Sequence, residues 1–103
     1  MAGHAIFIVH RTRPGQRDAV RAIWMKHMAP AIADNAGHLA YHYCLDSNDP
    51  DLIRVFQLYR DADAAAVFLR HPNYAAYQQE VLELLIEPSE IYAAEPAWQK
   101  TSP

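Results

Sequence analysis

Leu52-Ile-Arg-Val-Phe-Gln-Leu-Tyr59 is the stretch that decides the fold, because no other part of the chain reads so clearly as a β-strand. It is rich in β-branched and aromatic residues, which favour a pleated surface. The polar run Asp46-Ser-Asn-Asp-Pro-Asp51 precedes it and has the composition of a turn. Before that turn, residues 38–45 carry two tyrosines and alternating bulk. The sequence therefore predicts a β-hairpin over residues 38–59.

The region N-terminal to this hairpin predicts a strand followed by a helix. Residues 5–12 read Ala-Ile-Phe-Ile-Val-His-Arg-Thr, as in a strand buried on both faces, and Pro14-Gly15 breaks it. A helical period follows, and its apolar face comprises Val20, Ile23, Trp24, His27, Met28 and Ala31. The helix should end before Asn35-Ala36-Gly37, with Gly37 suited to a left-handed helix cap.

The region C-terminal to the hairpin predicts a second, interrupted helix and a last strand. Asp61 or Asp63 can cap an alanine-rich helix start, and Pro72 should interrupt this helix before a helical pattern resumes over residues 74–85. Residues 90–98 form a short fourth strand, which Pro96 would confine to an edge or an end.

The predicted order of elements is βαββαβ, which is the split-βαβ pattern of the ferredoxin-like α+β fold. The length of 103 residues suits one domain, so we expect a single domain over 1–103 with its core at about 4–98. An antiparallel sheet of this kind carries both helices on one face. Simple alternation then assigns five apolar side chains to the bare face: Phe7, Val9, Leu39, Phe56 and Leu58. Such a face is too apolar to stay in water, so we expect a homodimer through it.

Composition excludes several kinds of partner. The net charge is −3 with a pI near 6.0, and no run of Lys or Arg is present, which argues against nucleic acid and against an anionic membrane surface. Cys44 is the one cysteine, so no internal disulfide or Cys-based zinc site is possible, and we expect a buried structural thiol. No segment has the ~20 apolar residues of a membrane span, and no signal peptide is indicated, so we expect a cytoplasmic protein.

Four short motifs occur in an order that resembles the antibiotic biosynthesis monooxygenase (ABM) family. They are Arg11-Thr-Arg-Pro-Gly15, Asn35-Ala-Gly37 with Tyr41 following, Phe56-Gln-Leu-Tyr-Arg-Asp-Ala-Asp63, and His71-Pro-Asn-Tyr74 followed by Tyr77. Each motif is weak alone, but together they span residues 4–98 and are fairly specific.

The resemblance implies a dimeric α+β barrel with a pocket in each subunit, between the sheet and the two helices. It also implies oxidation of quinols or polycyclic phenols by molecular oxygen without a metal or flavin, or opening of the haem ring. Many relatives have no known substrate, so the resemblance supports the fold more strongly than catalysis.

Two histidines are the candidate catalytic residues. Strand alternation places His10 on the same face as Ile6 and Ile8, and the resemblance implies that this face points into the pocket. There His10 would act as a base or as the partner of a substrate anion. Alternatively, it only forms a hydrogen bond at the interface of sheet and helices. His71 lies at the predicted helix break, where it could be aimed at a ligand or could be a surface loop residue.

The candidate substrate-binding residues are aromatic or carry a polar group beside an aromatic one. Tyr74 and Gln78 are one helical turn apart and could both donate to an oxygenated ring. Trp24 and His27, three residues apart, could form an aromatic wall with a polar group, and Phe68 could line the same pocket. The competing interpretation of these aromatic residues is ordinary core packing.

Haem and metal chemistry are both disfavoured. The haem-degrading branch would require an Asn, a Trp and a His at the positions of His10, Phe68 and Gln78, and all three differ. His38 and His42 share a strand face but are separated by roughly 13 Å along it, which is too far for one ion. We therefore predict no metal and no cofactor.

The function that the sequence favours is cofactor-independent monooxygenation of a quinol or polycyclic phenol. The partners would be a small aromatic substrate, molecular oxygen and a second copy of the chain. Two alternatives use the same pocket: a non-catalytic dimeric binding protein for a small aromatic ligand, and an isomerase or cyclase in which oxygen takes no part.

Overall fold

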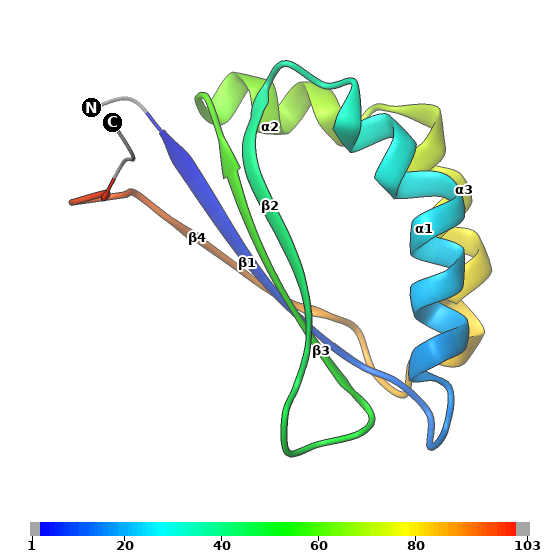
Figure 1. Ribbon diagram of the computed structural model, residues 1–103. Helices are drawn as coiled ribbons and strands as arrows, with labels where there is room; N and C mark the ends of the chain where they lie inside the picture. Colours follow the sequence, from blue (N-terminus) through cyan, green and yellow to red (C-terminus); the bar gives the residue numbers. More distant parts are fainter. Residues whose placement is uncertain (1–2, 101–103) are drawn as a thin grey trace.

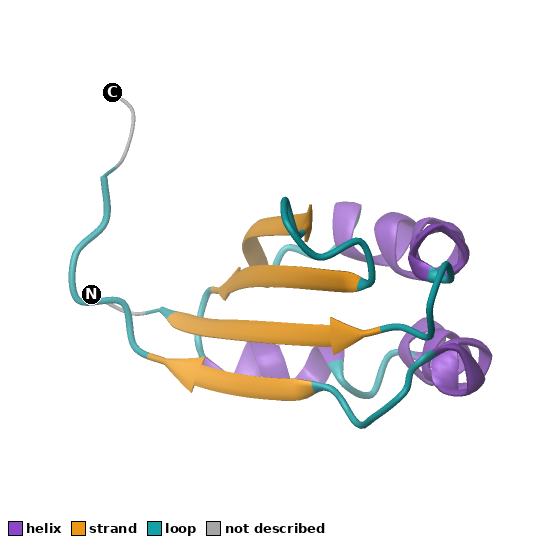
Figure 2. Ribbon diagram, turned by 90° about the horizontal axis from the view of Figure 1, so that it is seen from below, coloured by secondary structure: helices purple, strands orange, loops and turns teal. Residues whose placement is uncertain are grey.

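A computed structural model of the chain, which describes residues 3–100, contains a four-stranded antiparallel sheet with its helices on one face (Figures 1 and 2). In chain order the elements are β1 (His4–Arg11), α1 (Arg17–Ala33), β2 (His38–Leu45), β3 (Leu52–Tyr59), α2 (Ala62–Phe68), α3 (Pro72–Val81), a 3-10 turn (Leu82–Leu84) and β4 (Glu90–Ala94). This is the predicted βαββαβ order. No helix within residues 3–100 has the length and apolar character needed to cross a membrane.

The strand order is β2-β3-β1-β4, so the first strand lies inside the sheet between the third and the fourth. Phe7 pairs with Phe56 on β3 and with Tyr92 on β4, and all three pairings of the sheet are antiparallel. The ferredoxin-like α+β fold is thus confirmed. Strands β2 and β3 have the predicted bounds, whereas β4 ends at Ala94, two residues before Pro96.

The helices cover one face of the sheet and close the core from that side (Figure 1). Helix α1 buries the stripe Val20, Trp24, Met28 and Ala31, at the helical spacing that the sequence predicts. The Asp61 carboxylate accepts a hydrogen bond of 2.7 Å from the Ala64 backbone N–H and so caps α2.

Pro72 begins helix α3. At the first turn of a helix a backbone N–H has no partner within the helix, so proline is tolerated there. The predicted interruption is therefore the boundary between two separate helices, α2 and α3.

The prediction of a left-handed cap at Gly37 is wrong. The C-cap of α1 is Asp34, which has a right-handed backbone conformation, and among residues 3–100 only Gly15 has a positive φ, of 77°. Gly37 instead allows a close approach, because a Cβ at this position would lie 3.0 Å from the Cβ of Ala64 on α2. The loop before β2 lies close to α2 here, and a side chain at residue 37 would require the two segments to move slightly apart.

The open face of the sheet carries an aromatic row. The ring centroids of Phe7 and Phe56 are 5.2 Å apart, and Phe7 is 43% exposed. Leu58 belongs to this face but is buried, and it lines a cavity of about 230 Å³ together with Pro96 and Trp98 of the C-terminal tail. A β-bulge between His38 and Ala40 leaves Leu39 without a partner on β3, and its side chain is exposed.

The prediction that Cys44 is a buried thiol is wrong. Cys44 is paired with Arg54 of β3, and it is exposed. It occupies the sheet face that the helices do not cover, so alternation along β2 carries it away from the core.

Candidate functional site

A cavity of about 550 Å³ lies between the helices and the sheet. Strands β1 and β3 supply its floor, helices α1, α2 and α3 its walls, and residues 85–91 close one side. Its lining is mainly aliphatic and aromatic, with a few polar side chains, as in sites for small organic molecules. The cavity therefore suits a largely apolar ligand that carries a few oxygen atoms.

His10 and Ser89 form the polar group at one end of the cavity. His10 is 9% exposed, and its Nδ1 forms a hydrogen bond with Ser89 Oγ in the segment before β4. Burial lowers the pKa of His10 to about 4, so its imidazole is neutral at physiological pH. Because Nδ1 is engaged, Nε2 is the nitrogen left to meet a ligand.

Gln57 supplies a second polar group, about four strand residues away from His10. Gln57 pairs with Ile6, which precedes His10 by four residues on β1. On the cavity face, Gln57 and His10 are therefore separated by roughly 13 Å along the strands. The Gln57 amide oxygen accepts hydrogen bonds from the Tyr59 hydroxyl at 2.7 Å and from His38 Nε2 at 3.1 Å. The cavity thus has two polar groups separated along the strands, His10 with Ser89 and Gln57 with its hydrogen-bond partners.

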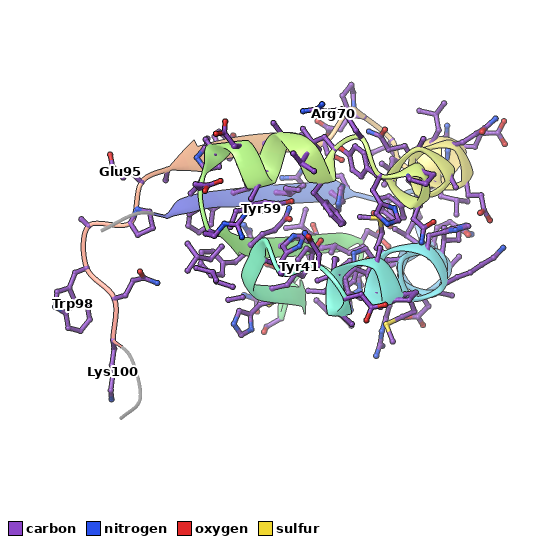
Figure 3. All side chains as sticks on the ribbon, turned by 90° about the horizontal axis from the view of Figure 1, so that it is seen from above. Tyr41, Tyr59, Arg70, Glu95, Trp98 and Lys100 are labelled. Atoms are coloured by element: carbon purple, nitrogen blue, oxygen red, sulfur yellow. The ribbon has the colours of Figure 1, made fainter. Side chains whose placement is uncertain are left out.

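Buried tyrosines surround the cavity. Tyr41 accepts a hydrogen bond of 3.2 Å from Trp24 Nε1, and the ring centroids of Trp24 and Tyr43 are 4.5 Å apart, with the ring planes tilted by 33°. Burial raises the pKa of Tyr41 to about 12, and it raises the pKa values of Tyr59 and Tyr77 still further. These phenols stay protonated at neutral pH, so they can donate hydrogen bonds but cannot act as bases. Figure 3 labels Tyr41 and Tyr59 toward the middle of the molecule, whereas Trp98 lies out on the C-terminal tail.

Helices α2 and α3 contribute the remaining aromatic and amide groups. Phe68 is 5% exposed, and its ring packs edge-on against His38 at 4.6 Å. Tyr74 accepts a hydrogen bond of 3.2 Å from Gln78 Nε2, and both side chains line the cavity. Burial raises the pKa of Tyr74 as well. This pair therefore offers a protonated phenol to a ligand.

The structure brings five of the seven candidate residues together around the cavity: His10, Trp24, Phe68, Tyr74 and Gln78. His27 and His71 are not part of the lining. The His27 ring is hydrogen-bonded to Glu80 and so links α1 to α3. His71 caps α3, where its Nδ1 accepts a hydrogen bond of 3.0 Å from the Asn73 backbone N–H.

Sequence reasoning missed six polar lining residues: Tyr41, Gln57, Tyr59, Tyr77, Glu87 and Ser89. Gln57 had a signal, because it is a polar residue on the same strand face as Val55 and Tyr59 in the best-defined strand. Ser89 had none, because it lies outside any periodic segment. Within residues 3–100, no three His, Cys, Asp or Glu side chains lie close enough together to hold a metal ion.

Solved structures share this fold over nearly their whole length. The protein Rv0793 from Mycobacterium tuberculosis is 25% identical, with a TM-score of 0.85 over 97% of this chain and 100% of that one. A candidate antibiotic biosynthesis monooxygenase from Chloroflexus aurantiacus is 22% identical, with a TM-score of 0.82 over 97% and 98% of the two chains. PA3566 from Pseudomonas aeruginosa is 18% identical, with a TM-score of 0.84 over 95% and 97%.

A family sequence model, rather than an individual relative, identifies the family. No curated protein matched the sequence. The sequence model of the antibiotic biosynthesis monooxygenase family matches residues 4–80, which include β1 to α2 and nearly all of α3. The chain therefore belongs to the antibiotic biosynthesis monooxygenase family.

Proposed function

We propose that the protein is a cofactor-independent monooxygenase that oxidises a quinol or polycyclic phenol with molecular oxygen. The observation that carries this proposal is the apolar cavity with a neutral, buried imidazole facing it. Membership of the family and the likeness to candidate monooxygenases support the same assignment.

The proposed reaction needs no electron carrier, because the substrate is itself the reductant. The substrate loses two hydrogen atoms, which leave as water with one atom of the oxygen molecule, and the other oxygen atom is bonded to the ring. A hydroquinone would thus give a hydroxyquinone and water. The protein has to bind the ring, help to remove a proton, and stabilise the resulting anion.

His10 is the proposed proton acceptor. With its pKa held near 4 it carries no charge before the substrate arrives, and its Nε2 is free of protein partners among residues 3–100. When Nδ1–H donates to Ser89 Oγ, Nε2 presents a lone pair to a substrate hydroxyl. A phenolate formed beside the ring would in turn stabilise the imidazolium, because opposite charges attract strongly in an apolar cavity.

The other lining residues would bind and orient the ring. Trp24 and Phe68 offer flat apolar surfaces, and the Tyr74 hydroxyl, paired with Gln78, offers a hydrogen-bond donor. These four side chains carry no charge, and Glu87 adds a carboxylate to the lining, so a substrate without negative charge is preferred.

The active form is proposed to be a homodimer through the open face of the sheet. Tyr92, Phe7, Phe56 and His42 form one row across all four strands of this face, and Tyr92 is 55% exposed. A partner of the same sequence would cover this row and remove it from water. Phe7→Glu should convert the dimer to a monomer in sedimentation analysis, and a wild-type monomer would refute this assembly.

Oxygen uptake tests the proposed reaction. Purified protein freed of metals is mixed with hydroquinones and with anthrone, and the rate without protein is subtracted. Uptake should depend on the protein and should fall at least about tenfold in His10→Gln, which keeps a hydrogen-bonding side chain but accepts no proton. Gln79→Ala, an exposed change outside the cavity lining, should leave the rate unchanged.

Two results would overturn the monooxygenase proposal. Binding of the aromatic compounds without oxygen uptake would indicate a carrier, and conversion of a substrate under nitrogen would indicate an isomerase or cyclase. Uptake that is unchanged in His10→Gln would refute the role of His10.

A further inference from the structure

A chain of hydrogen bonds at the Gln57 end of the cavity fixes the orientation of one amide. It starts at the Gly37 backbone N–H, which lies 3.3 Å from Asn35 Oδ1. A backbone N–H can only donate, so this contact identifies the oxygen of the Asn35 amide. The nitrogen of that amide, Nδ2, therefore faces His38 Nδ1, at 2.8 Å.

The Asn35 contact determines the tautomer of His38. Since Asn35 Nδ2 donates, His38 Nδ1 must be the accepting, unprotonated nitrogen, and the ring proton lies on Nε2. Burial lowers the pKa of His38, which keeps the ring neutral, as this arrangement requires. His38 Nε2–H then donates to the Gln57 side chain at 3.1 Å, so the atom it meets is the Gln57 oxygen.

Two donors therefore hold the oxygen of Gln57 and leave its nitrogen free. The Tyr59 hydroxyl donates to the same oxygen at 2.7 Å. Gln57 is 6% exposed and lines the cavity, and its Nε2 has no hydrogen-bond partner among residues 3–100. The hydroxyls of Tyr43 and Tyr77 are fully buried without a partner, whereas Gln57 Nε2 is not fully buried. Its two N–H groups thus remain available to a ligand in the cavity.

We propose that Gln57 is a specificity-determining residue whose amide N–H donates to a carbonyl or phenolate oxygen of the ligand. A side-chain amide that is free to rotate can bind either a donor or an acceptor on the ligand. The Gln57 amide is held in one orientation, so it offers the ligand only its N–H donors. A restrained donor aimed at developing negative charge is the usual means of stabilising an oxyanion. This role rests on the proposed function, because it takes the cavity to be the substrate site.

The test compares two ligands that differ in one oxygen atom. 1-Tetralone has a carbonyl as its only polar group, and tetralin is the same bicyclic skeleton without it. Equilibrium binding is followed by quenching of Trp24 fluorescence at neutral pH, in a Trp98→Phe background so that Trp24 is the one reporter. Neither ligand is a quinol or phenol, so the assay is independent of oxygen uptake.

Gln57→Glu is the informative variant, because a carboxylate can still accept from Tyr59 and His38 but offers no N–H. It should weaken tetralone binding about tenfold and leave tetralin binding unchanged. Gln57→Met, which removes both polar atoms, should give the same selective loss. Gln79→Glu adds the same charge at an exposed position of α3 and should change neither affinity. Thermal unfolding of each variant checks that the fold is retained.

Three outcomes would overturn the role of Gln57. They are equal loss for both ligands, no loss for tetralone in either Gln57 variant, and failure of both ligands to bind the wild-type protein. If the selective loss is found but no phenol drives oxygen uptake, the donor stands and the monooxygenase reaction fails. If uptake is found without selective loss, the reaction stands and the donor fails.

Discussion

The buried imidazole of His10 should make the stability of the protein depend on pH in a way that one substitution removes. Burial lowers the pKa of His10 from 6.5 to about 4 in the folded chain. As pH falls below 6.5, the unfolded chain takes up a proton on this ring and the folded chain does not. The contribution of the neutral His10 ring to the free energy of unfolding is therefore fully present above pH 6.5. It is lost as the pH falls from 6.5 toward about 4.

The size of this effect follows from the two pKa values. Each pKa unit corresponds to about 1.4 kcal/mol, so the full loss is about 3 kcal/mol, of which about 2 kcal/mol is lost by about pH 5. That is a large part of the free energy of unfolding of a small domain, which is roughly 5–15 kcal/mol.

Urea unfolding followed by circular dichroism at about pH 7 and about pH 5 measures the effect in wild type and in His10→Gln. The variant can still form a hydrogen bond with Ser89 but binds no proton in this range. The wild type should lose about 2 kcal/mol more than the variant between the two pH values. His38 and Asp46 also have lowered pKa values, but both are present in both proteins and cancel in the difference. Equal losses in the two proteins would refute the linkage.

Three further substitutions test the packing around the cavity and the capping of α2. Phe68→Ala removes a buried ring and should cost about 3–5 kcal/mol in urea unfolding, and a cost near zero would mean that the ring is not buried. Asp61→Ala removes the bond to the Ala64 N–H and should lower the free energy of unfolding by about 1 kcal/mol, with Asp61→Asn as the control that keeps the cap. Trp24→Phe removes the donor to Tyr41 and should cost about 1 kcal/mol more in wild type than in a Tyr41→Phe background, and equal costs would exclude coupling between the two side chains.

The fold was predictable because its signals are local. Strands β2 and β3 have their predicted bounds, since alternating bulk and a polar turn specify a hairpin without help from the rest of the chain. The stripe on α1 was predictable for the same reason, because residues three and four apart share one side of a helix.

The features that sequence reasoning missed depend on contacts between distant segments. The close approach of Ala64 to Gly37 is one such contact, which no local pattern shows. His71 caps α3 because the predicted helix break is the boundary between two separate helices. Its side chain is hydrogen-bonded to the backbone of α3, so it does not face a ligand. Gln57 could have been found, since a polar side chain at a buried strand position needs partners.

The position of β1 inside the sheet has a consequence for how the protein is made. One edge of β1 pairs with β3 and the other with β4, so its second edge finds a partner only after residues 90–94 have been synthesised. The His10 contact with Ser89 likewise joins residues 79 positions apart. Contacts of such long sequence separation slow folding and leave an unpaired strand edge exposed during synthesis. The nascent chain therefore passes through a stage in which one edge of β1 is unpaired and the side of the cavity that residues 85–91 close is still open.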